Sequence, residues 1–207
     1  MKCDGVLFDL DGTLWDATVP IAKSWAIVLE GEPGVDHAPT VQELEGVMGM
    51  TAEDLTATLF PGLDLERRME LFDKCCQAEC VYLAEHGGRL YEGIPQLLEE
   101  LSQRLPLFIV SNCNLEYIPS FLDGHRLHRF FKDWECIGRT GKPKWENIRL
   151  VVERNHLQAP VYVGDTAMDQ EAAGKAGVPF FHAAYGFGKV QGAAARLEKP
   201  LDLLALV

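Results

Sequence analysis

The sequence predicts an α/β protein whose doubly wound parallel sheet is interrupted after its first strand by a small inserted α-helical domain. Short apolar runs alternate with helical patterns from about residue 89 onward, which is typical of a parallel sheet. A similar apolar run stands at residues 3–9, but residues 16–88 show only helical patterns. We therefore expect a core domain of residues 1–15 plus 89–207 and a helical domain of residues 16–88.

Size and charge limit the classes of function. The chain has 207 residues and is 47% hydrophobic, enough for one sizeable core and an insertion. Its net charge of −12 argues against general nucleic-acid binding, which requires a basic patch. No apolar run reaches transmembrane length, and acids interrupt the first ten residues. We expect a cytoplasmic protein that binds no nucleic acid and no membrane, while its oligomeric state stays open.

Helix-start signals divide the inserted segment. The stretch Thr40-Val41-Gln42-Glu43 is a capping box, and Gly87 follows the last helical pattern as a stop. The expected helices begin near Thr18, at Thr40, at Thr51 and at Asp64, and the last runs to His86.

The rest of the chain alternates between helices and strands. Expected strands after the insertion lie at residues 105–110, 134–137, 161–163 and 178–182. Expected helices begin at Gly93 and cover residues 115–122, 144–156, 166–176 and 197–206. Ligands bind beyond the carboxyl ends of the strands in such sheets. Polar residues stand at three of these ends, namely Asp9 with Asp11, Ser111 with Asn112, and Asp165.

Two carboxylates stand one residue apart at the end of the first expected strand. Asp9 and Asp11 would share a face if the strand stayed regular, because side chains alternate along a strand. Two acids there repel each other and lose hydration, so they require a metal, hydrogen bonds or a shared proton. A solvated Asp-Gly loop is the alternative for this motif taken alone.

Four motifs together resemble those of the haloacid dehalogenase-like (HAD) hydrolase superfamily. They are Asp9-x-Asp11-Gly12-Thr13, Ser111-Asn112, Lys142-Pro143 and Gly164-Asp165 with Asp169. The stretch Gly164–Pro179 is similar to the phosphoglycolate phosphatase and beta-phosphoglucomutase branch, and the helical insertion resembles the small cap of that branch. The resemblance covers essentially the whole chain and implies a Rossmann-like core with a helical cap.

The resemblance implies a Mg²⁺-dependent phosphatase that hydrolyses a small phosphorylated metabolite, such as phosphoglycolate, a sugar phosphate or a nucleotide. Asp9 matches the nucleophile that forms an aspartyl phosphate, and Asp11 matches the acid and base that serves both half-reactions. The implied metal ligands are Asp9, the backbone carbonyl of Asp11, and Asp165. Asp169 would bind the metal directly or through a neighbour, or it is simply a first-turn acid favoured by the helix dipole.

The residues expected to contact the phosphate group are indicated less specifically by the sequence than the nucleophile and the metal ligands. Ser111, a candidate catalytic residue, and Asn112 supply polar groups at a strand end, and Thr13 is a further candidate phosphate contact. Lys142 would neutralise charge on Asp9 and the phosphoryl group. We favour Lys142 because it precedes proline as in the family pattern, and we expect Lys144, its rival, to be a solvated residue at a helix start.

Two other functions stay open. A mutase of the beta-phosphoglucomutase type shares the motifs, but such mutases carry a His about twelve residues after the nucleophile, where this chain has Ile21. A catalytically inactive binding or regulatory protein would keep the fold without turnover. Arg67, Arg68 and Lys74 of the expected cap are candidate substrate contacts. The alternative is that they lie on solvated helix faces, as such charges usually do.

Overall fold

Strand β1 (Gly5–Phe8) lies at the centre of a six-stranded sheet in which every pair of neighbouring strands is parallel. The computed structural model describes residues 3–207. The strand order is β5-β4-β1-β6-β7-β8, so β1 pairs with β4 (Leu107–Ser111) and with β6 (Pro160–Gly164). All three central strands are fully buried, which explains their unbroken apolar runs. The predicted α/β class is confirmed.

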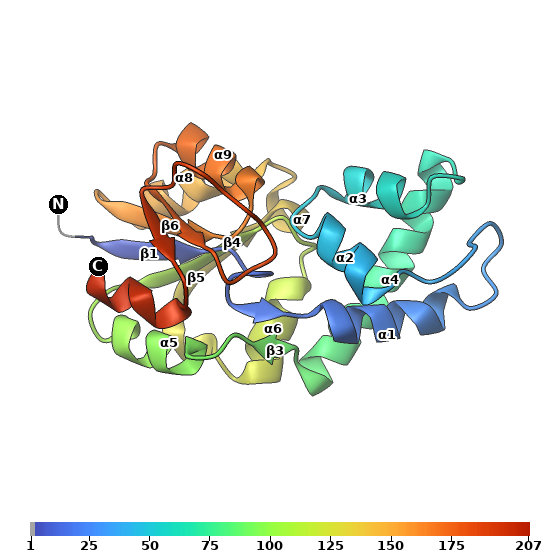
Figure 1. The fold of residues 1–207 in the computed structure, drawn as a ribbon, viewed down its shortest axis with the longest axis horizontal. Helices are drawn as coiled ribbons and strands as arrows, with labels where there is room; N and C mark the ends of the chain where they lie inside the picture. The colour runs from blue at the N-terminus through green and yellow to red at the C-terminus, as the bar shows by residue number, and fades with distance from the viewer. Residues whose placement is uncertain (1–2) are drawn as a thin grey trace.

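The two faces of β1 enter separate apolar clusters, as a doubly wound sheet requires. Val6 and Phe8 pack in the cluster that includes α5 and α6, whereas Leu7 packs with α8 and α9. Figure 1 shows these pairs of helices on opposite sides of the sheet. The helices are α5 (Ile94–Ser102), α6 (Tyr117–His125), α8 (Lys144–Arg154) and α9 (Ala167–Ala176).

The outer strands differ from the expected elements. They are β5 (Phe131–Cys136), β7 (Phe180–Ala183) and β8 (Ala195–Leu197). Strand β8 and the 3₁₀ helix Pro200–Ala205 replace the single helix expected at residues 197–206. An edge strand of three residues carries too little alternation to be recognised in the sequence. Two short helices, His128–Phe130 and α7 (Ile137–Thr140), complete this half of the chain.

Four helices form the cap at the carboxyl ends of the strands (Figure 1). They are α1 (Thr18–Leu29), α2 (Val41–Val47), α3 (Ala52–Leu59) and α4 (Leu65–His86). Thr40 and Glu43 form the predicted capping box, while Thr51 and Asp64 each accept a hydrogen bond from the first turn of the following helix. The domain division at residues 15/16 and 88/89 stays a prediction.

A two-stranded antiparallel ribbon joins core and cap where the chain passes between them. It pairs β2 (Trp15–Asp16) with β3 (Arg89–Leu90), and strands of two residues leave no sequence pattern to predict them. Asp16 accepts hydrogen bonds from Thr18 and forms an ion pair with Arg89. Within residues 3–207, no helix is both long and apolar enough to span a bilayer.

Helix α6 lies close against the long cap helix α4 at Gly124. A Cβ built on Gly124 would stand 2.5 Å from the carbonyl oxygen of Leu83, inside van der Waals contact. Helical glycine normally costs about 1 kcal/mol relative to alanine. The close approach of the two backbones therefore requires a residue that disfavours the helix.

We predict that Gly124→Ala lowers the free energy of unfolding by about 1–3 kcal/mol, because the backbones must separate. The matched control is Gly174→Ala in α9, where an added Cβ meets nothing within 4 Å. Only helix propensity differs between glycine and alanine at position 174, so we expect Gly174→Ala to raise the free energy of unfolding by up to about 1 kcal/mol. Urea unfolding measures both, and equal stabilisation of the two variants would contradict the close helix contact.

Candidate active site

Lys144, not Lys142, lies beside Asp9. The Nζ atom of Lys144 donates to Asp9 Oδ1 at 2.9 Å and to Asp169 Oδ1 at 2.7 Å, and the side chain is 4% exposed. Lys142 is half exposed and pairs instead with Glu146 at 3.5 Å. The expectation that Lys142 lies beside Asp9 and that Lys144 is solvated was therefore wrong.

The start of helix α8 explains this difference. Lys144 is the first residue of α8, and helical side chains point toward the N-terminus of their helix. The N-terminus of α8 faces the carboxyl edge of the sheet, so the ammonium group of Lys144 reaches the end of β1. Lys142 precedes the helix, in a turn held by the hydrogen bond from Asn147 to its carbonyl oxygen.

Two further carboxylates lie beside Asp9. Asp165 directly follows β6, and its Oδ2 accepts hydrogen bonds from the backbone N–H groups of Phe187 and Gly188. Its Oδ1 is buried and has no hydrogen-bond partner within residues 3–207. Asp169 stands in the first turn of α9, where its Oδ2 accepts from the backbone N–H and the hydroxyl of Thr166. Asp169 therefore does cap the start of α9, and its Oδ1 accepts a hydrogen bond from Lys144.

These three acids form a cluster with an excess of negative charge. One oxygen of each lies within 4.8 Å of the others, and all three residues are buried. Burial and the neighbouring Asp169 raise the pKa of Asp9 to about 6, and burial with Asp169 and Asp9 raises that of Asp165 to about 8. Although burial opposes both changes, Lys144 lowers the pKa of Asp169, while Asp169 and Asp9 raise that of Lys144.

The donor set fits a divalent metal ion. Of the three carboxylates, Asp9 and Asp169 share the ammonium group of Lys144, and Asp165 Oδ1 is a buried acceptor without a donor among residues 3–207. Hard divalent cations such as Mg²⁺ take oxygen ligands of this kind, and their charge would relieve the raised pKa values.

Glycines let two loops close on Asp165. Gly12 has a φ of +74°, and a Cβ there would stand 2.2 Å from Asp165 Oδ2. A Cβ on Gly186 would stand 2.2 Å from the carbonyl oxygen of Gly12, and one on Gly188 would stand 2.4 Å from that of Asp165. Sequence reasoning missed the loop at residues 186–188. Its Gly-Phe-Gly pattern was the available signal for a close backbone approach.

Asp11 faces away from this cluster. Its Oδ1 accepts a hydrogen bond from the hydroxyl of Tyr117 at 2.8 Å, and its side chain lines a cavity under the cap. Strand β1 ends at Phe8, so the alternation that would place Asp9 and Asp11 on one face does not extend to them. Burial and the charge of Asp9 raise the pKa of Asp11 to about 7.

The expected phosphate contacts lie at the same edge of the sheet. Ser111 is buried as the last residue of β4, next to β1. Thr13 is buried, and its hydroxyl has no hydrogen-bond partner in the described part of the chain. Asn112 donates through Nδ2 to the carbonyl oxygen of Gly49 at 3.2 Å, which joins core and cap. Its buried Oδ1 has no hydrogen-bond partner among the described residues.

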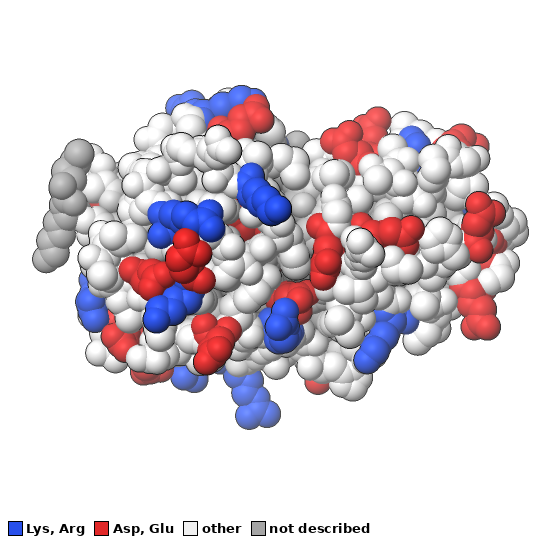
Figure 2. Space-filling model, viewed as in Figure 1, with Lys and Arg blue, Asp and Glu red and all other residues white. Residues whose placement is uncertain are grey.

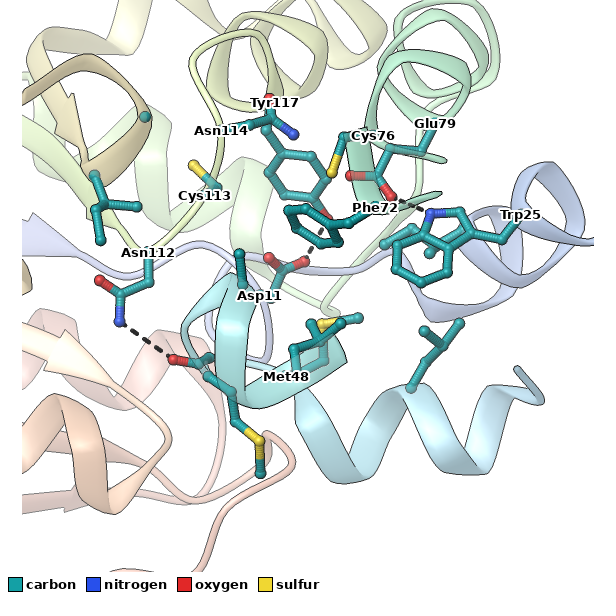
Figure 3. A pocket seen from close by; sticks show the side chains of 18 residues that line it. Asp11, Trp25, Met48, Phe72, Cys76, Glu79, Asn112, Cys113, Asn114 and Tyr117 are labelled. Carbon is teal, nitrogen blue, oxygen red and sulfur yellow. Dashed lines mark hydrogen bonds between the residues drawn. The ribbon is translucent and has the colours of Figure 1, made fainter. Parts of the chain in front are cut away.

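A cavity of about 280 Å³ lies between the cap and the core, with Asp11 in its wall. Most of the other lining side chains are apolar, as Figure 3 shows. Glu79 of α4 is buried there, and its Oε2 accepts a 2.6 Å hydrogen bond from Trp25 Nε1. Sequence reasoning missed Glu79, although an acid at the position between Cys76 and Leu83 interrupts the apolar stripe of α4.

The chain is similar to known proteins over most of its length. The model of the haloacid dehalogenase-like hydrolase family matches residues 6–183, so the chain belongs to this family. A phosphoglycolate phosphatase from Vibrio cholerae is 30% identical over 201 residues, covering 88% of this chain and 84% of that protein. One from Vibrio vulnificus is 29% identical over 209 residues, covering 92% and 87%.

A solved structure of a haloacid dehalogenase-like family hydrolase from Streptococcus pneumoniae has the same fold. It superimposes with a TM-score of 0.84 at 24% identity and covers 99% of this chain and 98% of its own. The resemblance to the phosphoglycolate phosphatase branch is thereby confirmed, and the chain is an enzyme of the phosphatase class. Measured turnover separates this class from the alternative of an inactive binding protein.

We predict that Lys144→Met lowers kcat for phosphatase turnover by at least about 100-fold, because Asp9 and the bound phosphoryl group lose their buried positive charge. Lys142→Met is the matched control and should change kcat by less than about twofold. Steady-state phosphate release measures both variants. If the Lys142 variant loses activity and the Lys144 variant keeps it, the lysine in the site is misassigned.

Glu79 should make stability depend on pH. Burial raises its pKa from 4.5 to about 8, so between these values the folded protein binds a proton that the unfolded chain releases. Stability is therefore lost as pH rises, and the free energy of unfolding of the parent relative to Glu79→Gln should fall by about 3 kcal/mol between pH 5 and 8. Urea unfolding of both proteins measures this difference. A difference that does not change with pH would show that Glu79 is ionised in the folded protein.

Proposed function

We propose that this chain is a Mg²⁺-dependent phosphatase that hydrolyses a small phosphorylated metabolite through an aspartyl phosphate, an acyl phosphate formed on Asp9. The observation that carries the proposal is the buried position of Asp9 at the end of β1, where Lys144 Nζ lies 2.9 Å from Oδ1. A carboxylate held there can attack phosphorus while its charge is balanced. The phosphoglycolate phosphatase relatives support the reaction class, but the substrate can equally be a sugar phosphate or a nucleotide.

The reaction proceeds in two displacements. A carboxylate oxygen of Asp9 attacks the phosphorus, the bond from phosphorus to the ester oxygen breaks, and Asp11 gives its proton to the leaving alkoxide. Asp11 then takes a proton from water, which attacks the phosphorus of the aspartyl phosphate and releases inorganic phosphate and the Asp9 carboxylate. Tyr117 holds the Asp11 carboxyl group in place through its 2.8 Å hydrogen bond.

The remaining site residues position charge. We propose that Asp9, Asp165 and the backbone carbonyl of Asp11 hold Mg²⁺, which would supply the positive charge that two anions require in order to meet. Both carboxylate oxygens of Asp169 already have partners, which favours an indirect role in orienting Lys144 over direct metal binding. A direct bond from Asp169 would require it to release one of them.

Polar groups at the strand ends would bind the phosphoryl oxygens. We propose this role for the hydroxyl groups of Ser111 and Thr13, since the buried Thr13 hydroxyl has no hydrogen-bond partner among the residues that the structure describes. Asn112 is the weaker candidate because its amide nitrogen already bonds Gly49. The mutase alternative gains no support, because the residue near the position of the mutase histidine is Ile21, which is buried and lines the apolar cavity.

The reaction can be tested with p-nitrophenyl phosphate. We expect phosphate release that requires Mg²⁺, stops with EDTA and falls at least about 1,000-fold in Asp9→Asn, which removes the nucleophile. Acid-quenched parent enzyme should contain protein-bound phosphate, and the Asp9 variant should contain none. Asp11→Asn should slow both formation and breakdown of this intermediate. Asp73→Asn, a change of the same kind on the cap, serves as the control. Normal turnover by the Asp9 variant would refute the proposed nucleophile.

A further inference from the structure

The cavity under the cap is the place where the alcohol part of the substrate would lie. Asp11 belongs to its wall, and the proton that Asp11 gives goes to the ester oxygen, so the leaving group must extend to the cavity side of Asp11. Asp9 and Lys144 do not line it, which keeps the phosphoryl group on the other side. This step rests on the proposed function.

Among residues 3–207, no lysine or arginine lines this cavity. Residues 16–88 contain fourteen Asp and Glu but only four Lys and Arg. Of these four, Arg67 and Lys74 form ion pairs with Glu32 and Glu70, Lys23 is exposed, and Arg68 also lies outside the cavity wall. Acidic side chains accordingly dominate the cap end of the face in Figure 2. The candidate substrate contacts at Arg67, Arg68 and Lys74 therefore do not meet a ligand in the cavity.

The polar group that the cap does supply is a carboxyl group. Figure 3 shows Glu79 pointing toward the cavity from α4, with its hydrogen bond to Trp25. Phe72 packs edge-on against Trp25, with ring centroids 6.1 Å apart, and Met48 lies across the cavity from them. An anionic leaving group would lose its hydration here without gaining a cation, and a cationic one would be desolvated among apolar side chains.

We propose that the enzyme acts on phosphate monoesters whose alcohol part is uncharged and largely apolar. A hydroxyl or carbonyl group on that part would meet the carboxyl group of Glu79. The cavity, at about 280 Å³, has room for the alcohol part of a small metabolite. The apolar walls then contribute binding in proportion to the area they remove from water. Phosphoglycolate, whose leaving group carries a carboxylate, fits this cavity poorly.

Four primary alkyl phosphates test the proposal on the unmodified enzyme with Mg²⁺. They are butyl phosphate, 2-hydroxyethyl phosphate, 2-phosphoglycolate and phosphoethanolamine, which differ mainly in the polarity and charge of the alcohol part. We expect kcat/KM to be highest for butyl phosphate and at least about tenfold lower for 2-phosphoglycolate and for phosphoethanolamine. A charged substrate that matches or exceeds butyl phosphate overturns the proposal, and so does 2-hydroxyethyl phosphate if it exceeds butyl phosphate.

A designed change of charge tests the cause. Met48 is half buried at the cavity, so Met48→Lys would place an ammonium group in the wall, and Met48→Gln is the matched polar control without charge. We expect the lysine variant to raise kcat/KM for 2-phosphoglycolate relative to 2-hydroxyethyl phosphate at least about tenfold, and the glutamine variant to change this ratio less than about twofold. Equal ratios in both variants overturn the electrostatic explanation.

p-Nitrophenyl phosphate separates this inference from the proposed function. If that ester is hydrolysed and 2-phosphoglycolate is preferred among the four alkyl phosphates, the phosphatase proposal stands and the cavity proposal is wrong. If no ester is hydrolysed with Mg²⁺, both are wrong. Circular dichroism of the two Met48 variants shows whether they are folded. The comparison of the four alkyl phosphates uses the unmodified enzyme and so does not depend on the folding of either variant.

Discussion

The burial of three carboxylates around one ammonium group is the constraint on which the rest of the structure depends. Asp9, Asp165 and Asp169 lose their hydration together, and within residues 3–207 Lys144 is the only cation paired with any of them, through Asp9 and Asp169. Desolvation of this size is tolerated where each oxygen meets a donor or an ion. A fold that holds such a cluster must therefore bring hydrogen-bond donors to it from distant parts of the sequence.

Several local features follow from this constraint. The loop at residues 186–188 approaches closely enough for two backbone N–H groups to reach Asp165, and only glycine permits that approach. Asp169 is fixed by the capping box at the start of α9, so the same bonds that begin a helix orient the partner of Lys144. Tyr162 adds a hydrogen bond from within β6 to the carbonyl oxygen of Val110, which ties β6 to β4 behind the cluster.

The fold could be predicted from the sequence because its signals are local and repeated. Unbroken apolar strands, the capping box at Thr40 and the glycine after α4 each specify an element from a few neighbouring residues. The carboxyl ends of the strands then placed Asp9, Ser111 and Asp165 at one edge. Elements of two or three residues, such as β2, β3 and β8, were missed because their pairing depends on distant partners.

The site could be predicted in part, and the failures have a common cause. Lys142 and Lys144 differ by two residues, and which one is buried depends on where α8 begins and on which way its first turn faces. A sequence motif specifies neither the first residue of a helix nor the direction in which its first turn faces. Glu79 was overlooked for a similar reason, because its role follows from packing against Trp25, which lies more than fifty residues away in the sequence.

Asp11 connects the two halves of the enzyme. Asp9, two residues earlier, faces the acidic cluster, whereas Asp11 faces Tyr117 and the cavity, because the strand ends at Phe8 and the chain turns at Gly12. In the proposed reaction, the cluster side handles the phosphoryl group, whose charge is common to every phosphate ester. The cavity side meets only what differs between esters. Two cap cations, Arg67 and Lys74, are paired with Glu32 and Glu70 away from the cavity, so under the proposed reaction they affect selectivity without weakening the chemistry at Asp9.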